Sequence, residues 1–307
     1  MAVIIDAKPL FQRIREEVRS EVSKLKDAGI TVGLAAILAE DDPTSKLYVS
    51  KKVKDCAKTG IYSEVWEIYR HPPASREREL IKLIRELNLR HDITGILVQL
   101  PLPHYMDLYR VLACVSPEKD VDGLTPFNKG IWMSSYDPRK NLLPCTAIGI
   151  LDLLDHYRID VSGMLVVIVG RSELVGKPLH KLLLDRDATP VCVHRKSRRA
   201  AELIAEADMV ICAVGRPPEL CHVDPFKLTG DMIREGAIVI NVGIRRDDEG
   251  NVYYDVDFES VCDKASYVTK NETVGYMTRA WLLKNTVIAA RIFGEKLGRE
   301  KIHQLNR

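Results

Sequence analysis

The sequence predicts two α/β domains with an interdomain cleft, the second domain being a Rossmann-type, doubly wound parallel sheet. Two observations support this fold class. The chain has 307 residues, which is more than one typical domain contains. Along that length, short apolar runs alternate with helical patterns, which is the order expected of repeated βαβ units.

The first series of elements ends near residue 103. It contains the apolar run TVGLAAILA, a polar helical stretch at 48–59 and the apolar run TGILVQLPLP. The following residues, 117–144, are rich in Pro, Asp, Gly and Asn, which indicates a loop. We therefore expect the connection between the two domains at 146–156.

The second series begins with MLVVIVG at Met164. A helical pattern at 174–184 follows, and then come the apolar runs PVCVH, MVICAVG and AIVINVG. Continuous apolar strands suit a parallel sheet that is covered on both faces. A last helical pattern, at 278–297, is expected to pack back on the first domain. The predicted division is 1–147 plus 279–307 for the first domain and 148–278 for the second.

Composition excludes several classes of protein. Apolar residues make up 46% of the chain and charged residues 29%, as in a globular protein that is not disordered. The net charge of +2 gives no broad attraction to nucleic acid or to a membrane, so neither is an expected partner. The seven cysteines include no C-x-x-C pair and the eight histidines no H-x-x-x-H pair, so no metal site is expected. Without a signal peptide or a membrane span, the chain is expected in the cytoplasm, with an organelle as the open alternative.

A dinucleotide site is indicated by the string VVIVGRSELVG. It places Gly170 directly after an apolar strand and Gly176 in the opening of the next helix. Glycine lets the backbone approach a pyrophosphate closely, and a helix N-terminus offers unpaired N–H groups. Because the spacing departs from G-x-G-x-x-G, an ordinary turn between a strand and a helix stays the alternative.

The end of the next strand favours NADP over NAD. An NAD site usually has Asp or Glu there for the ribose diol, but this chain reads HRKS from His194 to Ser197. Arg195, with Arg171 as a second candidate, suits the 2′-phosphate of NADP, because a guanidinium binds phosphate in fork geometry. The alternative is a solvated basic turn. Two more strand ends, 213–215 and 243–244, are expected at the same crevice.

Polar residues of the first domain form the candidate catalytic face. Ser45, Tyr48 and Lys52 are three and four residues apart, so a helix places them on one side. A lysine sheltered in a cleft has a lowered pKa and can exchange protons near neutral pH. A simple amphipathic surface pair is the alternative interpretation of Tyr48 and Lys52.

Two further polar features lie in the same half of the chain. Gln99 interrupts the apolar strand GILVQLPLP, where a buried amide needs partners. The KDVDG segment puts Asp120 and Asp122 in a turn-prone loop. The alternative interpretation of Gln99 is an amide that hydrogen-bonds to backbone, and that of the two aspartates is Asx-type capping.

Eight strings along the chain together carry a resemblance to a known family. In order, they are SKLYVSKKVK, GILVQLPLP, PEKDVDGLTPFNKG, PCTAIGILDLL, VGRSELVGKP, AIVINVGI, DVDF and VGYMT. They resemble the bifunctional methylenetetrahydrofolate dehydrogenase/methenyltetrahydrofolate cyclohydrolase family over nearly the whole chain. Such enzymes oxidise methylenetetrahydrofolate with NADP, hydrolyse the methenyl product to formyltetrahydrofolate and are commonly homodimers, so tetrahydrofolate derivatives are the implied partners.

The resemblance also implies roles for individual residues. Lys52 is the implied key catalytic residue, mainly in hydrolysis; Gln99 supports it, Tyr48 packs against the folate and Asp122 holds the pterin. Arg195 is implied beside the adenosine ribose and Ile244 near the nicotinamide. The other residues expected to contact the folate are Val98, Leu100, Val274 and Gly275. The full set expected to contact NADP is Gly170, Arg171, Ser172, Gly176, His194, Arg195, Ser197, Ala213, Gly215 and Ile244.

One loop departs from the family pattern. Where the family usually has P-V-P-G-G-V-G-P-M-T, this chain reads KNETVGYMT and is one residue shorter. Smaller departures occur at Ala147, Asn241 and Tyr254, where Pro, Asp and Gly are usual. Two other functions are weighed against the bifunctional enzyme because of this loop: a family member acting on a different reduced pterin, and a noncatalytic nucleotide-binding paralogue.

Overall fold

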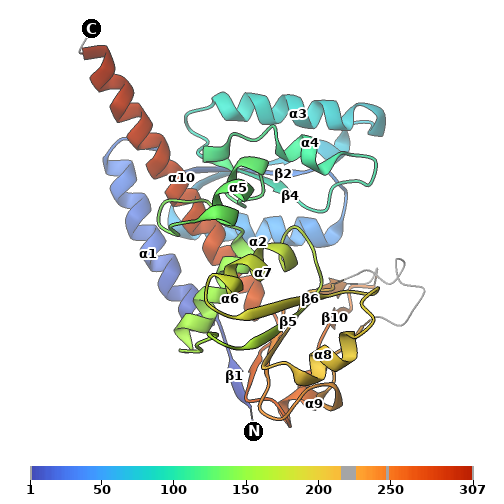
Figure 1. Ribbon diagram of the computed structural model, residues 1–307. Coiled ribbons are helices and arrows are strands. Elements are labelled where there is room, and N and C mark those ends of the chain that lie inside the picture. The colour runs from blue at the N-terminus through green and yellow to red at the C-terminus, as the bar shows by residue number, and fades with distance from the viewer. Residues whose placement is uncertain (1, 216–225, 247–248, 306–307) are drawn as a thin grey trace. The chain divides into compact units, whose positions relative to one another are not determined.

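The chain folds into two compact units, each built around its own sheet. The computed structural model describes the backbone of residues 2–215, 226–246 and 249–305 (Figure 1). The small-sheet unit comprises Gln12–Cys145 and Arg279–Arg307, and the large-sheet unit comprises Met1–Phe11 and Thr146–Thr278. Within the described residues, no helix is long and apolar enough to cross a membrane.

The sheet of the small-sheet unit has three parallel strands in the order β3-β2-β4. The central strand, β2 (Gly33–Leu38), is buried along its whole length, as its apolar sequence GLAAIL requires. Its neighbours are β3 (Tyr62–Glu67) and β4 (Gly95–Gln99). The helices of this unit are most of α1 (Lys8–Asp27), α2 (Pro43–Thr59), α3 (Pro73–Leu89), α4 (Leu108–Leu112), α5 (Pro126–Ser134) and most of α10 (Thr273–Leu305).

Both ends of α2 are set by local sequence. Asp42 caps the N-terminus, its carboxylate accepting a hydrogen bond from the Ser45 N–H, and Pro43 occupies the first turn, where no N–H partner is needed. Gly60 ends the helix in the left-handed conformation, with φ 81°. The helix therefore begins five residues before the polar helical stretch that the sequence indicated.

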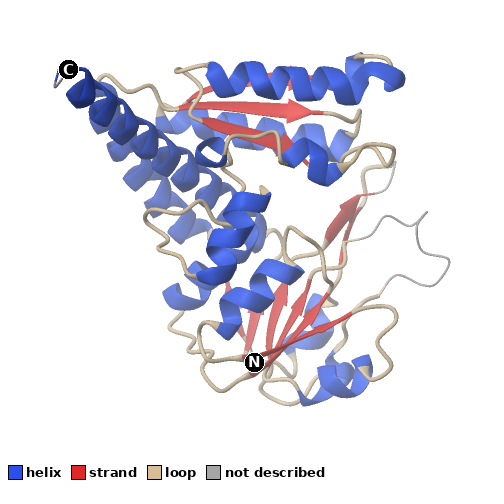
Figure 2. Cartoon of the chain, turned by 45° about the horizontal axis from the view of Figure 1, so that its top comes forward, coloured by secondary structure: helices blue, strands red, loops and turns tan. Residues whose placement is uncertain are grey.

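The large-sheet unit contains a sheet of six parallel strands, in the order β1-β11-β8-β7-β5-β6 (Figure 2). This confirms the predicted Rossmann-type α/β fold class. The strands are β1 (Val3–Ile5), β5 (Leu165–Val169), β6 (Thr189–Val193), β7 (Met209–Cys212), β8 (Ile238–Asn241) and β11 (Tyr267–Thr269). An antiparallel pair, β9 (Ile244–Arg246) and β10 (Val252–Tyr254), follows β8. The helices of this unit are α6 (Cys145–His156), α7 (Gly176–Leu184), α8 (Ala200–Glu206) and α9 (Phe258–Cys262).

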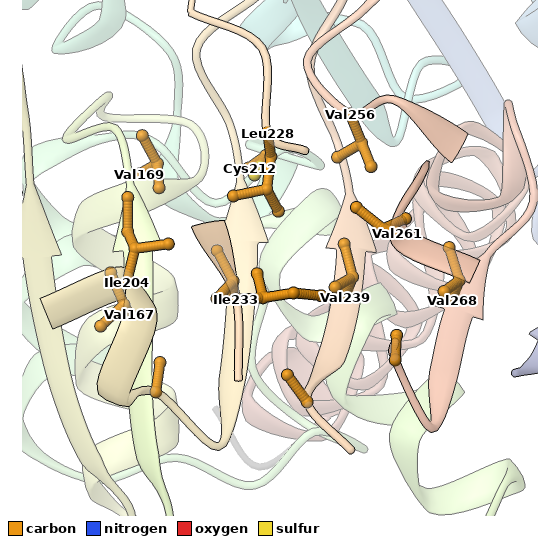
Figure 3. Packing of buried hydrophobic residues seen from close by; sticks show 14 of the residues in the cluster. Val167, Val169, Ile204, Cys212, Leu228, Ile233, Val239, Val256, Val261 and Val268 are labelled. Carbon is orange, nitrogen blue, oxygen red and sulfur yellow. The ribbon is translucent and has the colours of Figure 1, made fainter. Parts of the chain in front are cut away.

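Alternate residues of β5, β7, β8 and β11 point to one face of this sheet, where α8 and α9 cover them (Figure 3). Strand side chains alternate between faces, so each central strand contributes one or two residues to this core. The side chains labelled in Figure 3 are Val167, Val169, Ile204, Cys212, Leu228, Ile233, Val239, Val256, Val261 and Val268.

The first strand belongs to the large-sheet unit. β1 pairs with β11, and the N–H of Val3 donates to the carbonyl of Ser266. The expected division put residues 1–147 in the first domain, whereas the first eleven residues lie in the large-sheet unit. A run of three strand residues carries no sequence signal for its partner, which lies more than 260 residues away.

Candidate functional site

Lys52 and Gln99 form the centre of the polar cluster in the small-sheet unit. Lys52 is on α2 and only 8% exposed, and Gln99 is the last residue of β4. The Lys52 Nζ donates a hydrogen bond of 3.0 Å to the Gln99 Oε1. The Gln99 Nε2 in turn donates to the carbonyl of Leu100, at 2.7 Å. The amide is thereby oriented with its oxygen toward the ammonium group.

Asp122 completes this cluster electrostatically. Burial lowers the pKa of Lys52, and the charge of Asp122 opposes that effect. Burial likewise raises the pKa of Asp122, against the attraction of Lys52. A lysine and a carboxyl whose pKa values are shifted toward each other are suited to proton exchange, and such shifts are characteristic of functional sites.

The two aspartates of the KDVDG segment have different surroundings. The buried Asp120 accepts hydrogen bonds from the N–H groups of Leu124 and Thr125 and from the side chain of Asn128. It is thus the local cap that was the ordinary alternative for this loop. Asp120 holds the turn closed, and the turn leaves Asp122 beside Lys52 rather than in a cap of its own.

Asn285 of α10 is a residue that the sequence analysis missed. It is fully buried, and its Nδ2 donates to the carbonyls of Val121 and Leu143, each at 2.8 Å. The Cys145 Sγ also donates to the Val121 carbonyl, at 3.2 Å. Asn285 therefore fixes the backbone next to Asp122. An asparagine inside the apolar helical run WLLKNTVIAA was the available signal, since a buried amide needs partners.

A partly buried ion pair joins α10 to α2. The Arg279 guanidinium donates to the Asp55 carboxylate, at 2.6 Å, and Asp55 lies one turn after Lys52 on α2. Burial raises the pKa of Asp55, and Arg279 counters the rise. A paired buried carboxylate of this kind holds two helices in one register, because breaking the pair would leave an uncompensated charge.

The residues expected to contact the folate fall into both units. Tyr48 is half-buried on α2, four residues before Lys52 and thus on the same side of the helix. Val98 is buried within β4 and Leu100 follows that strand. Val274 and Gly275 lie in the first turn of α10, in the large-sheet unit. The small-sheet unit thus brings Lys52, Gln99 and Asp122 together, whereas Val274 and Gly275 belong to the large-sheet unit.

In the large-sheet unit, the expected dinucleotide residues follow adjacent strands. The chain runs from β5 to β6 on one side and then returns to β7 on the other, so the strand order reverses next to β5. Ligands of open α/β sheets bind at the carboxyl ends of the strands at such a reversal. The stretches Gly170–Gly176, His194–Ser197 and Ala213–Gly215 follow β5, β6 and β7.

The backbone at this reversal fits a pyrophosphate. Gly170 has φ 125°, which favours glycine, and a Cβ there would overlap the carbonyl of Ala213. The Ser172 Oγ accepts a hydrogen bond from the Val175 N–H, and α7 then begins at Gly176. The strand end, the bare glycine and the start of a nine-residue helix therefore form the kind of cradle that phosphate groups occupy.

The basic turn after β6 is closed on itself. The Ser197 N–H donates to the carbonyl of His194, at 2.7 Å, and the His194 N–H donates to the Ser197 Oγ, at 3.0 Å. Arg195 is exposed, as is Arg171. In the part of the chain that the structure describes, neither arginine has an ion-pair partner. Both guanidinium groups are therefore available to an anionic ligand.

Two sequence profiles of one family match this chain. The profile of the tetrahydrofolate dehydrogenase/cyclohydrolase catalytic domain matches residues 5–122, and that of the NAD(P)-binding domain matches residues 144–293. The chain is 44% identical over 308 residues to the bifunctional protein FolD of Pyrobaculum aerophilum, covering 97% of this chain and 99% of that one. It is 46% identical over 291 residues to FolD of Moorella thermoacetica, covering 94% and 99%.

Solved structures are similar over the same extent. The FolD methylenetetrahydrofolate dehydrogenase/cyclohydrolase of Campylobacter jejuni has a TM-score of 0.84 and 38% identity, covering 95% of this chain and 99% of that chain. The Trypanosoma brucei enzyme, solved in complex with NADP and an inhibitor, has a TM-score of 0.83 and 30% identity, covering 94% and 97%. Both likenesses extend across the two units.

Proposed function

The chain belongs to the tetrahydrofolate dehydrogenase/cyclohydrolase family, and we propose that it catalyses both reactions of that family's name. It oxidises 5,10-methylenetetrahydrofolate to 5,10-methenyltetrahydrofolate with NADP and hydrolyses the product to 10-formyltetrahydrofolate. Relatives 44% and 46% identical over nearly the whole chain are bifunctional proteins, which supports both activities. The observation that carries the proposal is the buried Lys52, which is hydrogen-bonded to Gln99 and lies beside Asp122. Neither alternative function is favoured by these findings.

We assign the hydrolytic half to Lys52. Adding water to the methenyl carbon requires that a proton leave the attacking water and that a proton reach the folate nitrogen whose bond to that carbon breaks. Burial lowers the pKa of Lys52, so its amine can take up and return a proton. Gln99 holds the amine through the 3.0 Å hydrogen bond. Asp122 is assigned to the pterin and Tyr48 to a packing contact with the folate.

The dehydrogenase half depends on the large-sheet unit. NADP, when bound, supplies the acceptor for the hydride that leaves the one-carbon bridge. Gly170, Arg171 and Ser172 are assigned to its pyrophosphate and Arg195 to its 2′-phosphate, because these groups lie at the strand-order reversal and both arginines are exposed. The remaining expected contacts of the cofactor are Gly176, His194, Ser197, Ala213, Gly215 and Ile244.

The division of labour between the two parts of the chain is also a proposal. We assign folate binding to residues 1–147 and 279–307, less the first eleven residues, and NADP binding to residues 148–278. Val274 and Gly275, at the start of α10, then contribute to the folate from the second part. Hydride transfer requires the nicotinamide and the one-carbon bridge to meet, so both parts are needed for oxidation.

We further propose a homodimer in the cytoplasm. The six cysteines that the structure describes are all free, as expected in a reducing compartment. Light scattering after size-exclusion chromatography should give twice the mass of the chain, and a monomer mass at micromolar concentration would contradict the dimer.

The proposed function is tested with the purified protein, 5,10-methylenetetrahydrofolate and NADP. We expect NADPH and 10-formyltetrahydrofolate to form, and the second product to form from methenyltetrahydrofolate when NADP is omitted. No NADPH at high enzyme concentration would refute the dehydrogenase activity. A hydrolysis rate no greater than the rate without protein would refute the cyclohydrolase activity.

A further inference from the structure

Asp255, directly after β10, accepts hydrogen bonds from the backbone that follows β7. The Val214 N–H donates to its Oδ2, at 2.6 Å. The Gly215 N–H lies 3.1 Å from Oδ1 and 3.2 Å from Oδ2, so it is shared between both oxygens. The carboxylate therefore orients two consecutive N–H groups at the carboxyl end of a central strand.

The same carboxylate packs against the turn between β8 and β9. A Cβ on Gly243 would overlap the Asp255 carboxylate, so only glycine leaves room for it. The Asp255 N–H also donates to the Gly243 carbonyl, at 3.3 Å. Gly243 directly precedes Ile244, the first residue of β9. One side chain thus sets the spacing between two backbone segments that lie at the dinucleotide edge of the sheet.

Pairing of the strands does not require this charge. β7 and β8 are already joined by their parallel ladder, and the Val242 and Gly243 N–H groups both donate to the Cys212 carbonyl. Asp255 is only 6% exposed, and burying a carboxylate is costly unless its hydrogen bonds are made. Burial raises its pKa, while the bonds from Val214 and Gly215 and the charge of Arg245 lower it. Its contacts act on residues beyond the strand ends, where a ligand would bind.

We infer that Asp255 is a positioning residue for the dehydrogenase reaction, which fixes residues 213–215 and 243–244 in the conformation that holds NADP. It takes no part in hydrolysis, because the hydrogen bonds it makes among the described residues all lie within the large-sheet unit. The inference rests on the proposed function, since it requires NADP to bind at this edge of the sheet.

Asp255→Asn tests the inference, with Asp257→Asn as the matched control. The amide oxygen can accept from one N–H, but its NH2 group would face the other donor. Asp257 is two residues away, pairs with Lys227 and caps α9 through the Ser260 N–H, and its described hydrogen bonds do not include residues 213–215. We expect Asp255→Asn to lower kcat/KM for NADP roughly tenfold to a hundredfold, the range for hydrogen bonds to a charged group. Hydrolysis of methenyltetrahydrofolate without NADP should keep its wild-type rate, and Asp257→Asn should change neither reaction.

Two results would overturn the inference: an unchanged kcat/KM for NADP, or an equal loss of both activities, which would indicate a general structural role. If Asp255→Asn does not fold, Gly243→Ala gives the second test, since its methyl group displaces the carboxylate without removing it. That variant must show the same loss of NADP turnover with hydrolysis intact. A wild-type protein that forms no NADPH would instead refute the proposed function, so the two failures are distinguishable.

Discussion

The ammonium group of Lys52 donates a 3.0 Å hydrogen bond to the side-chain oxygen of Gln99. The two residues are 47 positions apart in the chain. They meet because α2, which carries Lys52, packs on the three-stranded sheet, and Gln99 is the last residue of its strand β4. A neutral acceptor leaves the amine's pKa lowered by burial, whereas an anionic one would reverse that effect. The identity of the acceptor therefore tunes the proton chemistry of the lysine.

Gln99→Glu should move the Lys52 inflection in the pH–rate profile of hydrolysis to higher pH, by roughly one to three pH units. A carboxylate at hydrogen-bond distance stabilises the charged ammonium and so raises its pKa. The measurement is the hydrolysis rate of methenyltetrahydrofolate across pH without NADP. Gln99→Met is the control, because it removes the acceptor without adding charge. An inflection that stays in place or moves downward in Gln99→Glu would separate Lys52 from the observed titration.

Asn285→Ala should destabilise the protein by at least about 2 kcal/mol, because it removes the amide that donates to the buried carbonyls of Val121 and Leu143. The free backbone beside Asp122 should also raise KM for methenyltetrahydrofolate. Urea unfolding and steady-state hydrolysis measure the two effects. Thr286→Val is the matched control, since the Thr286 hydroxyl donates its described hydrogen bond within its own helix, to the Leu282 carbonyl. Equal KM values for Asn285→Ala and wild type would limit Asn285 to stability.

Arg195→Ala should raise KM for NADP by roughly tenfold or more and leave KM for NAD nearly unchanged, because only NADP carries the 2′-phosphate. Steady-state oxidation of methylenetetrahydrofolate with each cofactor provides the comparison. Arg198→Ala, an exposed arginine three residues further on, serves as control. Equal increases for NADP and NAD would reject the phosphate contact.

The fold class could be predicted because it depends on local signals. Continuous apolar runs of strand length occur at each central strand of the large sheet, and the glycines and caps mark where helices begin. The helix boundaries could be predicted less accurately. The helix α7 begins at Gly176, two residues after the start that the sequence indicated, and α10 begins at Thr273, five residues before its indicated start. Glu272, with φ 65°, forms the turn directly before α10. Glycine or asparagine is usual at a positive φ, so a glutamate there gave no signal that a helix begins at the next residue.

The candidate site could be predicted only in part, because its geometry depends on contacts between distant residues. Helical spacing put Tyr48 and Lys52 on one side of a helix, but nothing local assigned Gln99 to Lys52. Asp120 and Asp122 had the same ordinary interpretation. Asp120 is the one that makes the local cap, and only the long-range proximity to Lys52 distinguishes Asp122. Asn285 and Asp255 were missed because their partners are backbone groups far along the chain. The partners of Asn285 are at least 142 residues away, and those of Asp255 are about 40 residues away. The functional roles of these residues stay predictions.

The most direct test of the account is the rate at which Lys52→Met hydrolyses methenyltetrahydrofolate in the absence of NADP. The account predicts a loss of roughly a hundredfold to ten-thousandfold, the range for removing a general acid–base group, with unfolding by urea unchanged in midpoint or shifted upward. Lys54→Met, an exposed lysine on the same helix, should hydrolyse at the wild-type rate. A Lys52→Met enzyme as fast as the wild type would contradict the account.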